Sequence, residues 1–247
     1  MRRLDVALVA HGLAPTRSRA LDLIRRGYVS VGGVVVIKAS FLVADTAAIR
    51  LADAAPRHVS RGAEKLIAAL DHFGFDPAGR CAADIGASTG GFTEVLLARG
   101  AMDVTAVDVG SAQLHPGLRA DPRVVVLENR DARSLNAADF RAPITAVTAD
   151  VSFISMEKAL PVMLSLAAPA AWCVALIKPQ FEVGREHVGK GGIVRDASAA
   201  AAVVPRIARW LEVSGWSVCG TIPSPITGGD GNHEFLIGAR KVATESP

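Results

Sequence analysis

Cysteine is scarce in this sequence of 247 residues, and its scarcity excludes two classes of protein. The three cysteines, Cys81, Cys173 and Cys219, are too few and too scattered for the disulfide framework of a small secreted domain. No Cys-x-x-Cys pair occurs and the six histidines have no ligand spacing, so we expect no metal site. This cysteine usage fits a reducing cytoplasm, where we expect the protein to act.

A convincing export or membrane signal is also missing. The apolar run after the basic first residues is short and is broken by Asp5 and His11, unlike a signal peptide. Residues 159–177 carry no charge over 19 positions, which approaches the length of a membrane span. Because Pro161 and Pro169 interrupt this stretch, we expect a short helix, a turn and a buried strand there, and no membrane association.

Positive charge is concentrated in residues 1–57, which predict a small α+β domain. They hold nine Lys/Arg and four Asp/Glu, a net charge of +5, whereas the rest holds 18 and 20, a net of −2. Apolar spacing predicts two short helices, the second opening at Thr16, and a hairpin around Gly32-Gly33. Pro56 marks the joint, so we expect one domain over 1–57 and another over 58–247.

Short apolar strands alternate with helices from residue 60 onward. This alternation predicts an α/β fold with a mostly parallel, seven-stranded, Rossmann-like sheet and helices on both faces. Ligands of such sheets sit at the carboxyl ends of the strands. The predicted helices include 92–99, 155–167 and 196–213, and the predicted strands are Cys81–Ile85, Val104–Val107, Val124–Leu127, Ile144–Thr148, Trp172–Ile177, Trp216–Ile222 and Glu234–Ile237.

A glycine turn follows the first strand of this domain, in the order Asp84-Ile-Gly86-Ala87-Ser88-Thr-Gly90-Gly91-Phe92. Glycines let a backbone approach a ligand closely, and the helix start offers free N–H groups to a carboxylate. Ser88 stands where a dinucleotide fingerprint has its second glycine, which disfavours a pyrophosphate. The turn therefore suits a smaller ligand with an amino-acid tail, whose ammonium Asp84 could reach directly or through water.

Two further acids follow the next strands. Asp108, followed by Val109, can accept from both ribose hydroxyls of an adenosine, and Asp131, followed by Ala132, can accept from an adenine amino group. The alternative is that these acids only cap helices and turns. Three acids at consecutive strand ends favour an adenosine-bearing ligand.

Four charged residues stand at or near the ends of later elements. Asp150 ends the fourth strand, Lys178 the fifth, and Glu234 starts a late strand, while Lys65 lies on the first helix of the domain. A lysine directly after a buried strand is costly to desolvate unless it is paired or functional.

These four residues match, in order and in element context, the Lys-Asp-Lys-Glu tetrad of the FtsJ-like ribose 2′-O-methyltransferases, which the large domain resembles. The small domain resembles the S4 RNA-binding domain through Arg3-Leu-Asp, Gly12-Leu, Ser18-Arg19, Gly27 and Val29-Ser-Val31. The combination resembles the TlyA family, also labelled haemolysin A. Its signatures are matched by Ser60–Lys65, Asp84–Phe92, Asp150–Ser155, Lys178–Glu182, Gly189–Val194 and Gly231–Glu234.

The resemblance implies S-adenosylmethionine as cofactor and methylation of a ribose 2′-oxygen, chiefly of cytidine, in ribosomal RNA of one or both subunits. It implies that Lys178 lies nearest the hydroxyl and accepts its proton, and that Asp150 and Glu234 hold the two lysines. Asp150 also belongs to the expected cofactor site. Two alternatives stay open: a membrane-acting haemolysin, and an RNA-binding protein with an inactive methyltransferase fold.

We expect the basic side chains of the small domain to track an RNA backbone without reading its sequence. Aromatic residues are scarce there, since only Tyr28 and Phe41 occur, so extensive base stacking is not expected. The sequence does not determine the oligomeric state. The expected RNA-binding residues are Arg2, Arg3, Arg17, Arg19, Arg25, Arg26 and Lys38.

Overall fold

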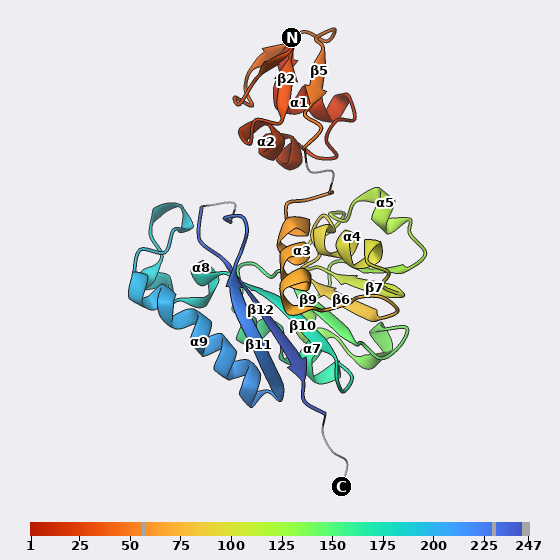
Figure 1. Cartoon of the computed structure of the whole chain (residues 1–247), viewed down its shortest axis with the longest axis vertical. Helices are drawn as coiled ribbons and strands as arrows, with labels where there is room; N and C mark the ends of the chain where they lie inside the picture. The colour runs from red at the N-terminus through yellow and green to blue at the C-terminus, as the bar shows by residue number, and fades with distance from the viewer. Residues whose placement is uncertain (56–57, 229–230, 244–247) are drawn as a thin grey trace. The chain divides into compact units, whose positions relative to one another are not determined.

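A computed structural model describes residues 1–55, 58–228 and 231–243 of the chain. Their contacts form two compact units, Met1–Arg61 and Gly62–Pro247 (Figure 1). Pro56, where the sequence predicts the joint, lies outside the described residues. Among the residues that are described, no helix combines the length and the apolar character needed to cross a bilayer.

The small unit packs two helices against short strands. Its helices are α1 (Leu4–Ala10) and α2 (Arg17–Arg25), and Thr16 caps α2 by accepting from the backbone N–H of Arg19 at 3.2 Å. One sheet pairs β1 (Arg2–Arg3) with β4 (Leu42–Val43), and the other has the order β3 (Val34–Val35), β2 (Val29–Val31), β5 (Ile49–Leu51). The predicted hairpin is confirmed, with both Gly32 and Gly33 at positive φ in its turn.

The large unit is built on a seven-stranded sheet in the order β11-β12-β10-β9-β6-β7-β8. Neighbouring strands from β10 to β8 run parallel, and β12 runs antiparallel to both β10 and β11. The predicted fold class is therefore confirmed. The strands are β6 (Cys81–Ile85), β7 (Asp103–Val107), β8 (Val124–Leu127), β9 (Ala146–Ala149), β10 (Trp172–Ile177), β11 (Trp216–Pro223) and β12 (Phe235–Lys241).

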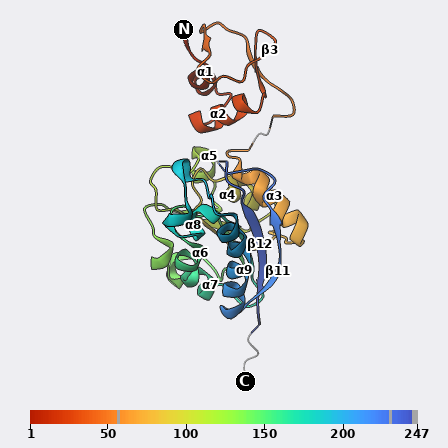
Figure 2. The same cartoon turned by 90° about the vertical axis from the view of Figure 1, so that its left-hand side faces the viewer.

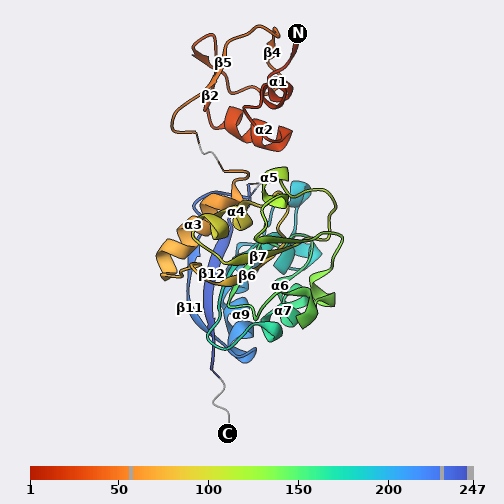
Figure 3. The ribbon, with the colours of Figure 1, turned by 90° about the vertical axis from the view of Figure 1, so that its right-hand side faces the viewer.

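Helices cover both faces of this sheet (Figures 2 and 3). On one face, α3 (Gly62–Phe73) and α4 (Gly91–Ala98) bury a core that includes Leu66 and Leu96. On the other, α6 (Met156–Ala159), α7 (Pro161–Leu166) and α9 (Ala197–Val213) bury a second core that includes Leu160 and Ile207. The shorter α5 (Pro116–Arg119) and α8 (Pro179–Glu182) lie in loops that follow strands.

The uncharged stretch 159–177 folds as expected, into the end of α6, α7 and the buried strand β10. The helix predicted over 155–167 is wrong in one respect, since it is two short helices. Pro161 opens the second helix, because its ring fixes φ and it has no N–H to continue the first.

Candidate functional site

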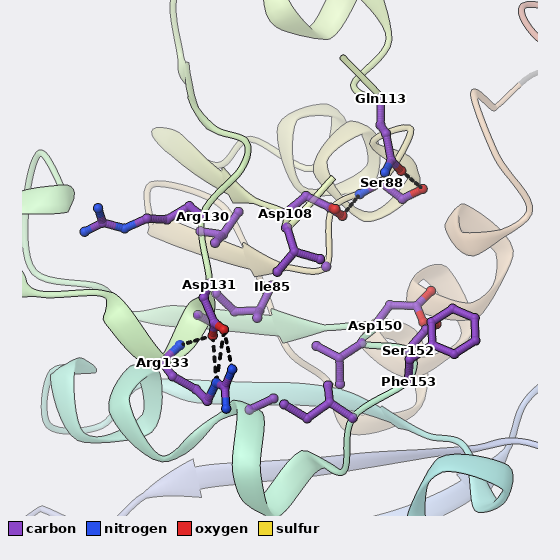
Figure 4. Close-up of a pocket in the computed structure, with 17 residues that line it drawn as sticks. Ile85, Ser88, Asp108, Gln113, Arg130, Asp131, Arg133, Asp150, Ser152 and Phe153 are labelled. Atoms are coloured by element: carbon purple, nitrogen blue, oxygen red, sulfur yellow. Dashed lines mark hydrogen bonds and ion pairs between the residues drawn. The ribbon is translucent and has the colours of Figure 1, made fainter. Parts of the chain in front are cut away.

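The site lies where the strand order reverses, next to the neighbouring strands β6 and β9. From β6 the chain proceeds outward through β7 to β8 and then crosses back to β9, so loops diverge at the carboxyl ends of β6 and β9. A pocket of about 520 Å³ opens at this edge (Figure 4). Residues from the ends of β6, β7, β8 and β9 line it, including Ser88, Asp108, Asp131 and Asp150.

The glycine turn brings the backbone close to both the pocket and β9. Gly86 has a φ of +83°, and a Cβ at this position would come within 2.5 Å of the carbonyl oxygen of Asp150. Gly90 has a φ of +97° and stands at the start of α4. Ser88 has a φ of +47°, so a serine occupies the left-handed conformation that glycine normally supplies. The turn therefore leaves no room for larger side chains beside the pocket.

Asp84 supports this turn from inside the core. It is fully buried, and its two oxygens accept hydrogen bonds from Thr93 Oγ1 at 2.7 Å and Thr148 Oγ1 at 3.0 Å. Burial raises the pKa of this carboxyl to about 6, although the two hydroxyls favour the charged form. A nearby ammonium would favour that charged form further. The two threonines belong to no motif in the sequence, and only their burial within apolar elements sets them apart.

Asp108 joins the end of β7 to the glycine turn. Its Oδ2 accepts from the backbone N–H of Ser88 and its Oδ1 from that of Gly110, both at 2.7 Å. These bonds hold the carboxylate in one orientation at the pocket wall (Figure 4). Each oxygen retains a lone pair, so the group can still accept from a ligand hydroxyl.

Asp131 lies on another side of the pocket and is bound to Arg133. The backbone N–H of Arg133 donates to Asp131 at 2.9 Å, and the guanidinium contacts the same carboxylate at 2.6 Å. The Arg133 side chain therefore lowers the pKa of Asp131 to about 2. Asp131 thus caps a short helical turn, which is the alternative role named from the sequence. It also lines the pocket.

The predicted cofactor residues divide into two groups. One group lines the pocket and comprises Gly86, Ser88, Asp108, Val109, Asp131, Ala132 and Asp150. The other group shapes the turn from behind the pocket wall and comprises Asp84, Ala87, Gly90, Gly91 and Phe92, all of them buried.

The four charged residues of the predicted tetrad form two ion pairs. Lys178, directly after β10, places its Nζ 2.6 Å from Asp150 Oδ1. Lys65, on α3, places its Nζ 2.5 Å from Glu234 Oε2, and both side chains of this second pair are at most 10% exposed. Each lysine thus has an acidic partner, as the resemblance implied.

Three residues that sequence reasoning did not single out lie beside these pairs. Ser152 accepts a hydrogen bond from Lys178 Nζ at 2.8 Å. Phe153 is 90% exposed with a φ of +64°, and its ring lies 5.0 Å from that of Phe181. Figure 4 shows Asp150, Ser152 and Phe153 together on one side of the pocket. An exposed phenylalanine in a left-handed backbone conformation is unusual, but only the three-dimensional structure reveals it.

Asn232 ties the segment before Glu234 to the loop that follows α8. Its side chain is buried, donates to the carbonyl of Gly192 at 2.8 Å and accepts from the backbone N–H of Val194 at 3.1 Å. Within the loop, Val188 and Val194 form an antiparallel bridge. The last two motifs matched to the TlyA family, residues 189–194 and 231–234, are therefore in direct contact.

In the small unit, a buried aspartate organises two of the expected RNA-binding arginines. Asp5 is fully buried and accepts from Arg3 Nε at 3.0 Å and from Arg17 Nη2 at 2.8 Å. These bonds, that of Arg3 most strongly, lower the pKa of Asp5 to about 2. Both guanidiniums keep exposed surface, so they are held at fixed positions while remaining accessible.

The expectation that Arg19 belongs to an exposed RNA-binding surface is wrong. Its side chain is 3% exposed and pairs with Asp22 at 2.9 Å, because it lies on the inner side of α2. A phosphate could reach Arg19 only if this pairing opened. Arg19 therefore does not belong to the proposed RNA-binding residues. The exposed members of the predicted set are Arg2, Arg3, Arg17, Arg25, Arg26 and Lys38.

Comparisons with known proteins agree with this architecture. The family model for the FtsJ-like methyltransferases matches residues 58–241, and that for the S4 domain matches residues 2–48. The 16S/23S rRNA (cytidine-2′-O)-methyltransferase TlyA of Mycobacterium tuberculosis (strain ATCC 25618 / H37Rv) is 46% identical, over 96% of this chain and 89% of that protein.

Solved structures extend the likeness. A protein of Streptococcus thermophilus described as a hemolysin has a TM-score of 0.78 and 40% identity, over 99% of this chain and 89% of that one. An S-adenosylmethionine-dependent methyltransferase from Mesorhizobium loti has a TM-score of 0.52 over 70% of this chain and 96% of that one, and at 13% identity it shares the fold alone. The chain therefore belongs to the FtsJ-like methyltransferase family, in its TlyA group, in which an S4 domain precedes the methyltransferase domain.

Proposed function

We propose that this methyltransferase transfers a methyl group from S-adenosylmethionine to the ribose 2′-oxygen of a cytidine in 16S or 23S ribosomal RNA, or in both. The observation that carries the proposal is the Lys178–Asp150 pair at the edge of the pocket, because Asp150 also lines that pocket. The amine of Lys178 is thereby held beside the pocket that the cofactor would occupy. The substrate is proposed by analogy with the relative in Mycobacterium tuberculosis, a 16S/23S rRNA (cytidine-2′-O)-methyltransferase.

The pocket fits S-adenosylmethionine in its chemistry. Asp108 offers acceptors for the ribose hydroxyls, Asp131 an acceptor for the adenine amino group, and Val109 an exposed apolar surface beside them. Gly86 lets the turn pack directly against the end of β9, because a Cβ there would come within 2.5 Å of the Asp150 carbonyl oxygen, and both residues thereby line the pocket. When bound, S-adenosylmethionine supplies a methyl group on a positively charged sulfonium.

Lys178 acts as the proton acceptor for the ribose hydroxyl. A 2′-hydroxyl is a poor nucleophile until its proton is drawn away. For this step Lys178 has to be in its neutral amine form. The hydroxyl proton then passes to the lone pair of Lys178 Nζ, and the oxygen keeps the electron pair of the broken O–H bond, with which it can bond to the methyl carbon. Asp150 stabilises the ammonium that results, at 2.6 Å. Lys65 and Glu234 support the neighbouring part of the site, since their pair is buried and Phe235, next to Glu234, pairs with Ile177, next to Lys178.

Phe153 offers the target base a place to stack. Its ring is almost fully exposed beside Asp150 and Ser152, where a nucleotide entering the site would pass. Base–aromatic stacking is worth about 1–3 kcal/mol and tolerates any base, so this contact would hold the nucleotide without selecting it.

Residues 1–57 form the proposed RNA-binding domain and 58–247 the methyltransferase domain. The fixed pair Arg3 and Arg17, together with Arg25 and Lys38, presents guanidinium and ammonium groups suited to phosphates. Each phosphate contact that is lost should reduce the salt dependence of binding by about one unit of slope. Arg25→Gln should therefore bind ribosomal RNA less tightly, with a shallower salt dependence.

Nucleoside analysis tests the proposed reaction. Purified protein is incubated with S-adenosylmethionine and ribosomal subunits from a strain that lacks the modification, and the RNA is digested for mass spectrometry. We expect 2′-O-methylcytidine with the wild-type protein and none with Lys178→Met. A base-methylated product would refute the mechanism, and no product despite cofactor binding would support the alternative of an inactive fold.

A further inference from the structure

Ser152 contacts the proposed catalytic lysine and is not one of the four tetrad residues. It lies two residues after Asp150, beyond the end of β9, and lines the cofactor pocket. Lys178 Nζ donates to its Oγ at 2.8 Å, across 26 positions of the sequence. The hydroxyl, the carboxylate of Asp150 and the amine of Lys178 therefore meet at one point.

The two contacts of Lys178 differ in kind. The Asp150 contact is an ion pair of 2.6 Å, but Asp150 Oδ1 accepts no hydrogen bond from any described residue. The contact with Ser152 has both the distance and the angles of a hydrogen bond. Charge attraction alone holds a group near its partner without fixing its rotation. The orientation of the amine therefore depends on the serine.

Orientation matters because a proton acceptor must aim a lone pair. A neutral lysine amine has two N–H groups and one lone pair. One N–H of this amine points to Ser152 Oγ. The negative carboxylate of Asp150 repels a lone pair, so the second N–H takes the direction nearest Asp150 and the lone pair is left in the one remaining tetrahedral direction. We propose that Ser152 is a positioning residue that directs the lone pair of Lys178 toward the ribose 2′-hydroxyl. This inference rests on the proposed function.

The structure gives Ser152 little part in holding the fold. The residue is exposed, and its side chain makes no hydrogen bond to a described residue other than Lys178. Phe153 and the backbone of Met156 have other contacts that hold this segment, namely the Phe181 ring and the Glu182 carboxylate. Removing the Ser152 hydroxyl should thus leave the segment in place.

The test compares single-turnover methyl transfer to unmodified ribosomal subunits by the wild type, Ser152→Ala, Ser152→Thr, Ser155→Ala and Lys178→Met. Ser155 is a matched control, because it lies in the same segment and makes no side-chain cap hydrogen bond. Loss of the hydrogen bond that orients the neutral amine predicts a rate about tenfold lower for Ser152→Ala. We expect Ser152→Thr, which keeps the hydroxyl, and Ser155→Ala to stay within about twofold of the wild type.

The affinities for RNA and cofactor and the melting temperature should not change in Ser152→Ala. A wild-type rate for Ser152→Ala would overturn the proposal, and so would a defect confined to RNA affinity or one that threonine does not rescue. These outcomes are distinct from failure of the proposed function. That failure would appear as a wild type without transfer, or as full activity in Lys178→Met.

Discussion

The two lysine–carboxylate pairs of the site have the same chemistry but different surroundings. Lys65 and Glu234 are 2.5 Å apart, with side chains 10% and 3% exposed. Lys178 and Asp150 are 2.6 Å apart, with side chains 11% and 23% exposed, and Asp150 lines the pocket. The two lysines are buried alike, so the difference lies in the acids: Glu234 is enclosed by protein, whereas Asp150 faces the space that substrates would occupy.

This difference indicates a division of labour. A buried pair contributes little net stability, but removing one partner leaves an uncompensated charge in the interior. A pair whose acid lines a pocket can exchange a proton with a substrate that binds there. We therefore assign support to Lys65–Glu234 and proton transfer to Lys178–Asp150, and the first two of four predictions test this assignment.

The largest effect is expected at Lys178. Lys178→Met should reduce the rate of methyl transfer about 10³-fold, because a positioned proton acceptor contributes on that order. Cofactor affinity, measured by calorimetry, and melting temperature should stay near wild type, since Lys178 does not line the pocket and its partner Asp150 is 23% exposed to solvent. A large loss of stability would mean that this pair is also a structural support.

The second prediction concerns the enclosed pair. Lys65→Met or Glu234→Leu alone should lower the free energy of unfolding by about 4 kcal/mol, because each leaves one buried charge unpaired. The double variant should lose much less than the sum of the two. Urea denaturation of all four proteins measures the cycle, and strictly additive losses would show that the pair is not coupled in the folded state.

The third prediction uses the raised pKa of Asp84, about 6 in the folded protein against roughly 3.9 when unfolded. The folded state then binds this proton more tightly, so the associated stability is present below about pH 4 and is lost as the pH rises through about 6. Asp84→Asn should abolish this loss, which amounts to about 3 kcal/mol. Unfolding of the cofactor-free proteins across this range measures it, and parallel curves would contradict the assignment.

The smallest effect is expected at Asn232, next to the enclosed pair. Asn232→Leu, which is close in size and adds no charge, loses the bonds to both Val194 and Gly192, which should favour local opening of the loop by about 2 kcal/mol. Hydrogen exchange of the residue 189–194 segment measures the opening. His233→Ala is the matched control, because His233 is adjacent and exposed. Equal exchange in both variants would show that the side chain does not tie the loop.

Much of the large domain was predictable because local patterns carried the signal. Apolar strands alternating with helices predicted the sheet, and the positions of Asp108, Asp150 and Lys178 after strands predicted their shared edge. Boundaries were less predictable: Glu234 was expected to start a strand, which the structure begins at Phe235. The main-chain bonds that decide such ends come from neighbouring strands and loops, which local sequence does not specify.

The sequence by itself determined the fold class, the family and the identity of the charged residues, because these follow from periodicity and from motifs at strand ends. Only the tertiary structure decided which lysine pairs with which acid, that Arg19 is buried against Asp22, and that Ser152 meets Lys178. Lys65 and Glu234 are 169 positions apart, and their pairing depends on the packing of α3 against β12. Burial and orientation are properties of the packed chain, so no local pattern encodes them.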